Sequence, residues 1–166
     1  MKHHLFCLLG ILTAALLPIQ AAFAAEAADA DAIAAKLKAT GMDYTETSSG
    51  LFRLDVPNRN RSQLVFVSKT TVSFEGVPFF YIRATATIAD QRPVSTEQMR
   101  RLLMWKRDEL GHWALVPPKT TSDKWILQYV IALPLSSSAD ELKAALIACA
   151  FEADTKEQEL VGEDIR

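Results

Sequence analysis

The sequence predicts a single α+β domain in which helices pack on one face of an antiparallel sheet of about five or six strands. The 166-residue chain is 49% hydrophobic and 23% charged, which is typical of one globular domain. The expected strands follow one another through short polar turns, and groups of strands separate the expected helices. The resulting order of helix, four strands, helix, two strands and helix favours an antiparallel sheet over alternating parallel units.

The first 24 residues predict a secretory signal peptide. Residues 1–4 form a basic region with one lysine and two histidines, residues 5–19 are apolar, and Ala22 and Ala24 supply the small residues of a cleavage site. The apolar run is shorter than the roughly 20 residues of a typical transmembrane helix. We therefore expect cleavage after Ala24, a periplasmic or secreted protein, and no stable membrane insertion after cleavage. An uncleaved N-terminal anchor is the alternative.

The domain expected over residues 25–156 begins with a helix and two hairpins. Residues 29–40 predict a short amphipathic helix, because Ile33 and Leu37 lie four positions apart and Gly41 follows. Polar turns then separate short runs with strand composition. The strands expected here cover residues 44–47, 51–56 and 63–68.

The longest strand is expected over residues 77–88, which are rich in aromatic and β-branched side chains. Alternate residues of a strand point to opposite faces of the sheet. The set expected on the core face is Phe80, Ile82, Ala84, Ala86 and Ile88. The opposite set is Phe79, Tyr81, Arg83, Thr85 and Thr87. Tyr81 and Arg83 favour a partner-binding surface, and packing beneath a loop or tail is the alternative.

Two capping boxes mark helix starts in the second half of the chain, at residues 95–98 and 138–141. The acidic end of the chain predicts a frayed tail. The elements expected here are a helix over residues 95–109, strands over residues 112–116 and 124–133, a helix from residue 138 to at least Asp154 with Leu160 as the alternative end, and a flexible tail over residues 157–166.

In the last expected strand, Trp125, Leu127, Tyr129, Ile131 and Leu133 form the stronger apolar set and should point inward. A pocket between the sheet and the helices, lined by Trp113, Trp125 and Tyr129, would suit a small ligand or a lipid. This pocket is the basis of our alternative functional hypothesis.

The last expected helix has an apolar stripe formed by Leu142, Ala145, Leu146, Cys149 and Ala153. Ile147 and Phe151 lie away from this stripe, as Met104 does on the middle helix. We expect Met104, Ile147 and Phe151 to form a surface for self-association or for a partner, and burial by another part of the chain is the alternative. On the core stripe, Cys149 should be an inert buried thiol rather than a redox residue.

The composition argues against several classes of function. The chain has 18 basic and 20 acidic residues, a formal net charge of −2 that does not suit a general nucleic-acid binder. After cleavage, Cys149 is the only cysteine and His112 the only histidine, so an internal disulfide is impossible and no zinc site is expected. The glycines are isolated from one another and form no phosphate-binding loop. We therefore expect no cofactor and no metal.

Few residues are suited to catalysis. A nucleophile would need His112 as its base, and we interpret His112 as a polar residue of an edge strand. The carboxylate clusters, Asp108 with Glu109 and Glu152 with Asp154, lie in helices rich in Lys and Arg, where solvated faces are the usual interpretation. We therefore expect a protein that is not an enzyme.

Several short motifs follow this order of elements: Leu37–Gly41 before Tyr44, Gly50–Phe52, Phe80–Ala84, Ser95 with Met99, Leu102 and Leu103, Trp125–Leu127, Ala132–Leu135 and Glu141–Leu142. From about Ala32 to Asp154 the chain thereby resembles the YbjN-like group of the type III secretion chaperone-like fold. It departs from that group at Trp105–Arg107, where the family often has an asparagine-rich helix end. The resemblance implies a small non-catalytic domain that binds protein partners and often dimerises, and it implies no particular site residue.

Taken together, these patterns predict a secreted, periplasmic, non-catalytic binding module of a chaperone or regulator kind. We expect its partner to be a protein or a second copy of the chain, and not a nucleic acid. A cytoplasmic effector, the partner of secretion chaperones, does not suit a chain with a signal peptide.

Overall fold

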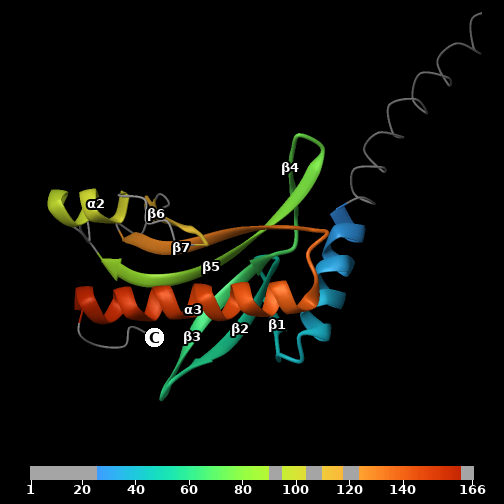
Figure 1. Cartoon of the computed structure of the whole chain (residues 1–166), viewed down its shortest axis with the longest axis horizontal. Coiled ribbons are helices and arrows are strands. Elements are labelled where there is room, and N and C mark those ends of the chain that lie inside the picture. Colours follow the sequence, from blue (N-terminus) through green and yellow to red (C-terminus); the bar gives the residue numbers. More distant parts are fainter. Residues whose placement is uncertain (1–25, 90–94, 104–109, 118–123, 162–166) are drawn as a thin grey trace, which may run out of the picture.

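The computed structural model describes residues 26–89, 95–103, 110–117 and 124–161 (Figure 1). One antiparallel sheet of seven strands has helices packed against it, which confirms the predicted α+β class. The strands are β1 (Thr45–Glu46), β2 (Leu51–Asn58), β3 (Arg61–Ser68), β4 (Val72–Phe74), β5 (Val77–Ala89), β6 (His112–Val116) and β7 (Trp125–Pro134). The helices are an N-terminal helix over residues 26–39, α2 (Thr96–Leu103) and α3 (Ala139–Val161).

The strand order across the sheet is β1-β2-β3-β5-β7-β6, and the short strand β4 also pairs with β5. Val67 of β3 lies opposite Ile82, and Val72 of β4 lies opposite Phe79. From the first pair to the second, the chain covers five residues between β3 and β4 but only three residues along β5. The segment between β3 and β4 therefore forms a bulge. The hydroxyl of Ser68 lies at the bulge, where it accepts a hydrogen bond from the Tyr81 N–H at 2.9 Å. The sequence did not predict β4.

The turn between β4 and β5 is a tight two-residue loop. Phe74 pairs with Val77, and the two residues between them both have positive φ, 49° at Glu75 and 81° at Gly76. Positive φ at both central positions is the pattern of a type I′ turn, whose twist matches that of the flanking strands. The β4–β5 hairpin therefore projects as a regular extension of the sheet (Figure 1).

The core lies between the sheet and α3, whose stripe of Leu142, Ala145, Leu146, Cys149 and Ala153 is buried as predicted. The capping box at the start of α3 is also confirmed, because the Ser138 N–H donates to Glu141 at 2.6 Å and the Glu141 N–H donates to the Ser138 hydroxyl at 3.2 Å. The hydrogen bonds from Ser138 lower the pKa of Glu141. Cys149 is fully buried, and burial raises the pKa of its thiol to about 12.

The N-terminal helix closes one end of this core. Ile33 and Leu37 are fully buried in it, as the amphipathic pattern predicted. The Lys36 ammonium donates to the Ser137 carbonyl at 2.6 Å, and the Lys143 ammonium of α3 donates to the Thr40 carbonyl at 3.2 Å. These two bonds fasten the end of the N-terminal helix to the start of α3.

The prediction that Ile88 lies on the core face is wrong. The register of β5 against β7 shifts between Thr85 and Thr87, so the alternation of faces changes at this bulge. Thr87 is buried as a result, whereas Ile88 is 45% exposed. Before the bulge, Phe80, Ile82 and Ala84 are buried as predicted.

The flexible tail was predicted to begin at residue 157, but residues 157–161 belong to helix α3. Helix α3 continues to Val161, and Glu157 is buried. Residues 1–24, with the predicted signal peptide, and residues 162–166 lie outside the described residues, as does Met104. Within the described residues, none of the helices has the length and apolar character needed to cross a membrane.

Candidate partner-binding surface

The face of the sheet opposite α3 carries a set of apolar side chains that we call the open face. Helix α3 packs on the core face, and α2 lies beside β6, with Leu102 against the buried Ala86 and Leu127. Cα partners on neighbouring strands place their side chains on the same face of a sheet. The open face comprises Leu64 and Phe66 of β3, Val72 and Phe74 of β4, Val77, Phe79, Tyr81 and Arg83 of β5, and Val130 and Ala132 of β7, of which Val130 is already buried.

Exposure on the open face increases toward the β4–β5 hairpin. Phe79 and Tyr81 are half-buried in the middle of the sheet. Phe74, beside the turn, is 67% exposed, and its partner Val77 is 42% exposed. A projecting hairpin with exposed aromatic and aliphatic side chains, joined to further apolar surface, is typical of an interaction site.

Arg83 lies at the centre of the open face, between Phe66 of β3 and Val130 of β7. Its side chain is half-buried, and among the described residues it makes no ion pair. Its guanidinium carbon lies 6.0 Å from the centre of the Tyr81 ring. The structure thus brings together Tyr81 and Arg83, two of the residues predicted to bind a partner.

A groove of about 520 Å³ borders the open face beside Arg83. The start of the N-terminal helix, the β1–β2 turn and the bulge after β3 form its walls. The lining residues include Glu26, Ala27 and Ala30 of the helix, Ser49–Leu51 of the turn, and Ser68–Thr70 of the bulge. Lys69 is the other cation in the groove, and it is already paired with Glu46.

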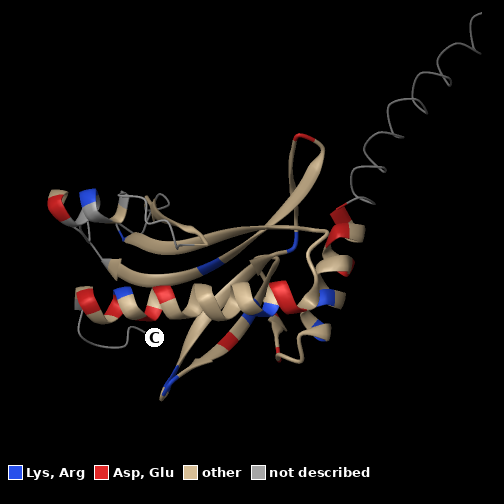
Figure 2. Ribbon diagram, in the orientation of Figure 1, with Lys and Arg blue, Asp and Glu red and all other residues tan. Residues whose placement is uncertain are grey.

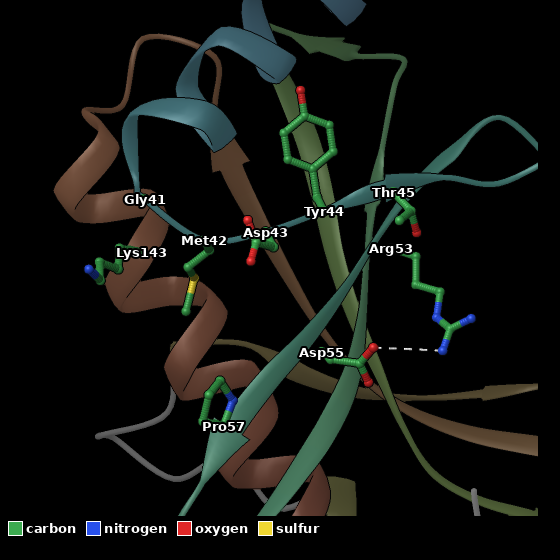
Figure 3. Close-up of a pocket in the computed structure, with 9 residues that line it drawn as sticks. All are labelled: Gly41, Met42, Asp43, Tyr44, Thr45, Arg53, Asp55, Pro57 and Lys143. Atoms are coloured by element: carbon green, nitrogen blue, oxygen red, sulfur yellow. Dashed lines mark ion pairs between the residues drawn. The ribbon is translucent and has the colours of Figure 1, made fainter.

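A second groove, of about 490 Å³, lies between the end of the N-terminal helix, β2 and α3 (Figure 3). Figure 3 shows Arg53 and Asp55 pointing toward one another on β2, where their charged groups lie 3.7 Å apart. On the α3 side, Lys143 is already bound to the Thr40 carbonyl. Both cations of this groove therefore have partners within the chain, and sequence reasoning did not predict the groove.

The outer side of α3 carries Ile147 and Phe151, which are 47% and 40% exposed, respectively. Both therefore lie off the core stripe, as predicted. The Arg59 guanidinium carbon lies 5.5 Å from the centre of the Phe151 ring and partly covers it. Because α3 separates this surface from the sheet, the structure does not bring Ile147 and Phe151 together with Tyr81 and Arg83.

Two of the three aromatic residues proposed to line an internal pocket, Trp113 and Tyr129, pack against one another. The ring centres of Trp113 and Tyr129 are 5.0 Å apart, and Tyr129 is almost fully buried. The Tyr129 hydroxyl accepts a hydrogen bond from the Gly111 N–H at 2.9 Å. Trp125 is half-buried at the start of β7, and neither of the two grooves includes any of the three residues.

The interpretation of Asp154 as part of a solvated face is wrong. Asp154 is only 4% exposed, because Arg61 of β3 places its Nε 3.2 Å from Asp154 Oδ1. Arg61 also lies 3.4 Å from the buried carboxylate of Glu157, and Asn58 donates to Asp154 at 2.9 Å. This cluster fastens the end of the β2–β3 hairpin to α3.

The described residues contain no group of three or more His, Cys, Asp or Glu side chains positioned to hold a metal ion. His112 is exposed at the start of β6, opposite Val130 on the open face. It therefore lies on the edge strand where the sequence predicted it.

Comparison with known proteins assigns no family to the chain. No family model, no curated protein and no solved structure matches it. The resemblance to the YbjN-like group stays a prediction.

Proposed function

We propose that this chain is a secreted, periplasmic, non-catalytic module that binds a protein partner through the open face and the β4–β5 hairpin. The observation that carries the proposal is the continuous apolar surface from Phe66 and Tyr81 to the exposed tip at Phe74 and Val77. Protein interfaces are enriched in aromatic residues and arginine, and this surface combines both around Arg83. The expected signal peptide supports the periplasmic location.

A protein suits this surface better than a small molecule does. The open face is broad, spans β3, β5 and β7, and ends in a projecting hairpin, whereas small ligands usually bind in enclosed concave sites. A partner that covers Tyr81 and Phe79 would complete the burial that the sheet begins.

Photo-cross-linking in cells tests the proposal. A photoreactive amino acid replaces Phe74 at the hairpin, Phe151 on the outer side of α3, or the exposed Lys38 of the N-terminal helix as a control for background. We expect irradiation to give a discrete heavier adduct from position 74 only. Mass spectrometry of the adduct then identifies the protein that is bound.

Two results would contradict the proposal. Adducts from position 74 at the background level of position 38 would show that no protein covers the hairpin. A discrete adduct from position 151 alone would place the partner on α3, as the helical pattern of Ile147 and Phe151 predicted.

A further inference from the structure

Two side chains of opposite charge lie on either side of Phe79 along the β4–β5 hairpin. Arg83 is the half-buried cation of the open face, and Glu75 is exposed in the turn. Neither makes an ion pair within the part of the chain that the structure describes. Figure 2 shows the same arrangement as a basic segment within β5 and an acidic segment at the hairpin turn.

These two charges are too far apart to meet within one chain. A strand rises about 3.3 Å per residue, so eight positions separate Glu75 from Arg83 by roughly 26 Å. They are nevertheless equally distant in sequence from Phe79, at four positions on each side. A twofold rotation about an axis near Phe79 would therefore place Glu75 of one copy opposite Arg83 of the other, and the reverse.

The apolar residues have the same self-complementary arrangement. In this antiparallel face-to-face pairing, Val77 of one copy lies opposite Tyr81 of the other, and the two Phe79 residues meet at the axis. The exposed tip at Phe74 would reach the groove beside Arg83, which is walled by the small residues Ala27, Ala30 and Gly50. A contact of this kind covers the apolar surface and pairs both unpaired charges at once.

We propose that the partner on the open face is a second copy of this chain, in a twofold dimer with Phe79 at its axis and two reciprocal Glu75–Arg83 ion pairs. The inference rests on the proposed function, because it names the occupant of the same surface. Covering the half-buried Arg83 with an apolar partner that offers no anion would be energetically unfavourable, and Glu75 of the second copy supplies that anion. An anionic membrane surface is disfavoured because the projecting turn is acidic.

Charge reversal and rescue test the dimer. The chain, purified after export, is compared with its Arg83→Glu, Glu75→Arg and doubly reversed variants by sedimentation over a dilution series. We expect the native chain to dimerise, each single variant to dimerise at least roughly tenfold more weakly, and the double variant to recover most of the loss. The matched control is Lys38→Glu, which makes the same charge change at an exposed position of the N-terminal helix.

Glu75→Arg keeps the test valid if Arg83→Glu affects folding. Glu75 is exposed, with φ of 49°, and the chain already accommodates an arginine at φ of 54°, at Arg59. Far-ultraviolet circular dichroism and thermal unfolding of each variant confirm that the fold is retained.

Three results would overturn the inference: a monomeric native chain at all concentrations, a dimer that neither single reversal weakens, or a double variant that remains as weak as the single variants. A monomer that floats with phosphatidylglycerol vesicles would assign the surface to a membrane instead. A monomer that still gives a discrete adduct with another protein from position 74 would overturn the dimer and leave the proposed function standing.

Discussion

The core face and the open face of the sheet are built from the same strands but meet different surroundings. On β5, Phe80 points toward α3 and is fully buried, whereas its neighbour Phe79 points to the open face and remains half-exposed. The alternation of a strand sorts adjacent residues of one type into two roles. Aromatic content alone therefore does not distinguish the core face from a binding surface. The two faces are distinguished by the position of α3, which covers only the core face.

The largest expected effect is on the core face. Phe80→Ala should lower the free energy of unfolding by about 3–5 kcal/mol, because it leaves a cavity beneath α3. Phe79→Ala is the matched control and should cost much less, since its side chain is already partly in water. Urea unfolding of both variants measures the difference. Equal losses would mean that the two faces do not differ as described.

The next largest effect concerns the ionic cluster at the far end of α3. Asp154→Asn should destabilise the fold by about 2 kcal/mol, because it removes one of the two buried carboxylate charges beside Arg61 and leaves only Glu157 to pair with the guanidinium. The same substitution at the exposed Asp55 should change stability by less than about 1 kcal/mol. Thermal unfolding of the two variants would reveal whether the cluster fastens the β2–β3 hairpin.

Cys149 makes the core side sensitive to alkaline pH. The folded thiol has a pKa of about 12 against an ordinary value of 9.0, so above pH 9 the unfolded chain loses this proton more readily than the folded chain does. Its contribution to stability is complete below pH 9 and is lost as the pH rises toward 12, by about 1.4 kcal/mol per pH unit.

The control for this prediction is Cys149→Ala, which should show a shallower decline of stability over the same pH range. Thiol-reactive dyes should label native Cys149 only after unfolding. Rapid labelling of the folded chain at neutral pH would be inconsistent with the buried position.

The smallest effect on stability is expected at the tip of the open face. Phe74→Ser should change the free energy of unfolding by less than about 0.5 kcal/mol, because the side chain is largely in water. The same change should weaken dimer formation in the sedimentation assay. A large loss of stability without any loss of association would assign Phe74 a structural role.

Local patterns predicted much of this fold. The stripe on α3, the capping box at Ser138 and the alternation from Phe79 to Ala84 each depend on residues close in sequence, and each agrees with the structure. Strand β4 escaped prediction because it is three residues long and exposed, and its pairing depends on a bulge.

Long-range contacts account for the other errors. The bulge in β5 that exposes Ile88 is set by pairing with β7, which no local pattern of β5 reports. The partner of Asp154 is Arg61, on another hairpin and more than 90 residues away in sequence. Tyr81 and Arg83 were predicted as surface residues, but the absence of an ion partner for Arg83 among the described residues emerges only from the packed sheet.

The bulge between β3 and β4 also has a mechanical consequence. The ladder of main-chain pairs between β3 and β5 ends at Val67 and Ile82, and pairing with β4 resumes at Val72 and Phe79. On the other side of β5, pairing with β7 ends at Phe79 and Pro134, with one further hydrogen bond from the Leu135 N–H to the Pro78 carbonyl at 2.8 Å. Beyond Phe79, the β4–β5 hairpin is held to the rest of the sheet by few hydrogen bonds. Bending of the chain at the bulge would therefore disturb few of the hydrogen bonds of the sheet. We expect this bending to let the tip of the β4–β5 hairpin adjust its angle to the surface of a binding partner, while the rest of the sheet stays rigid.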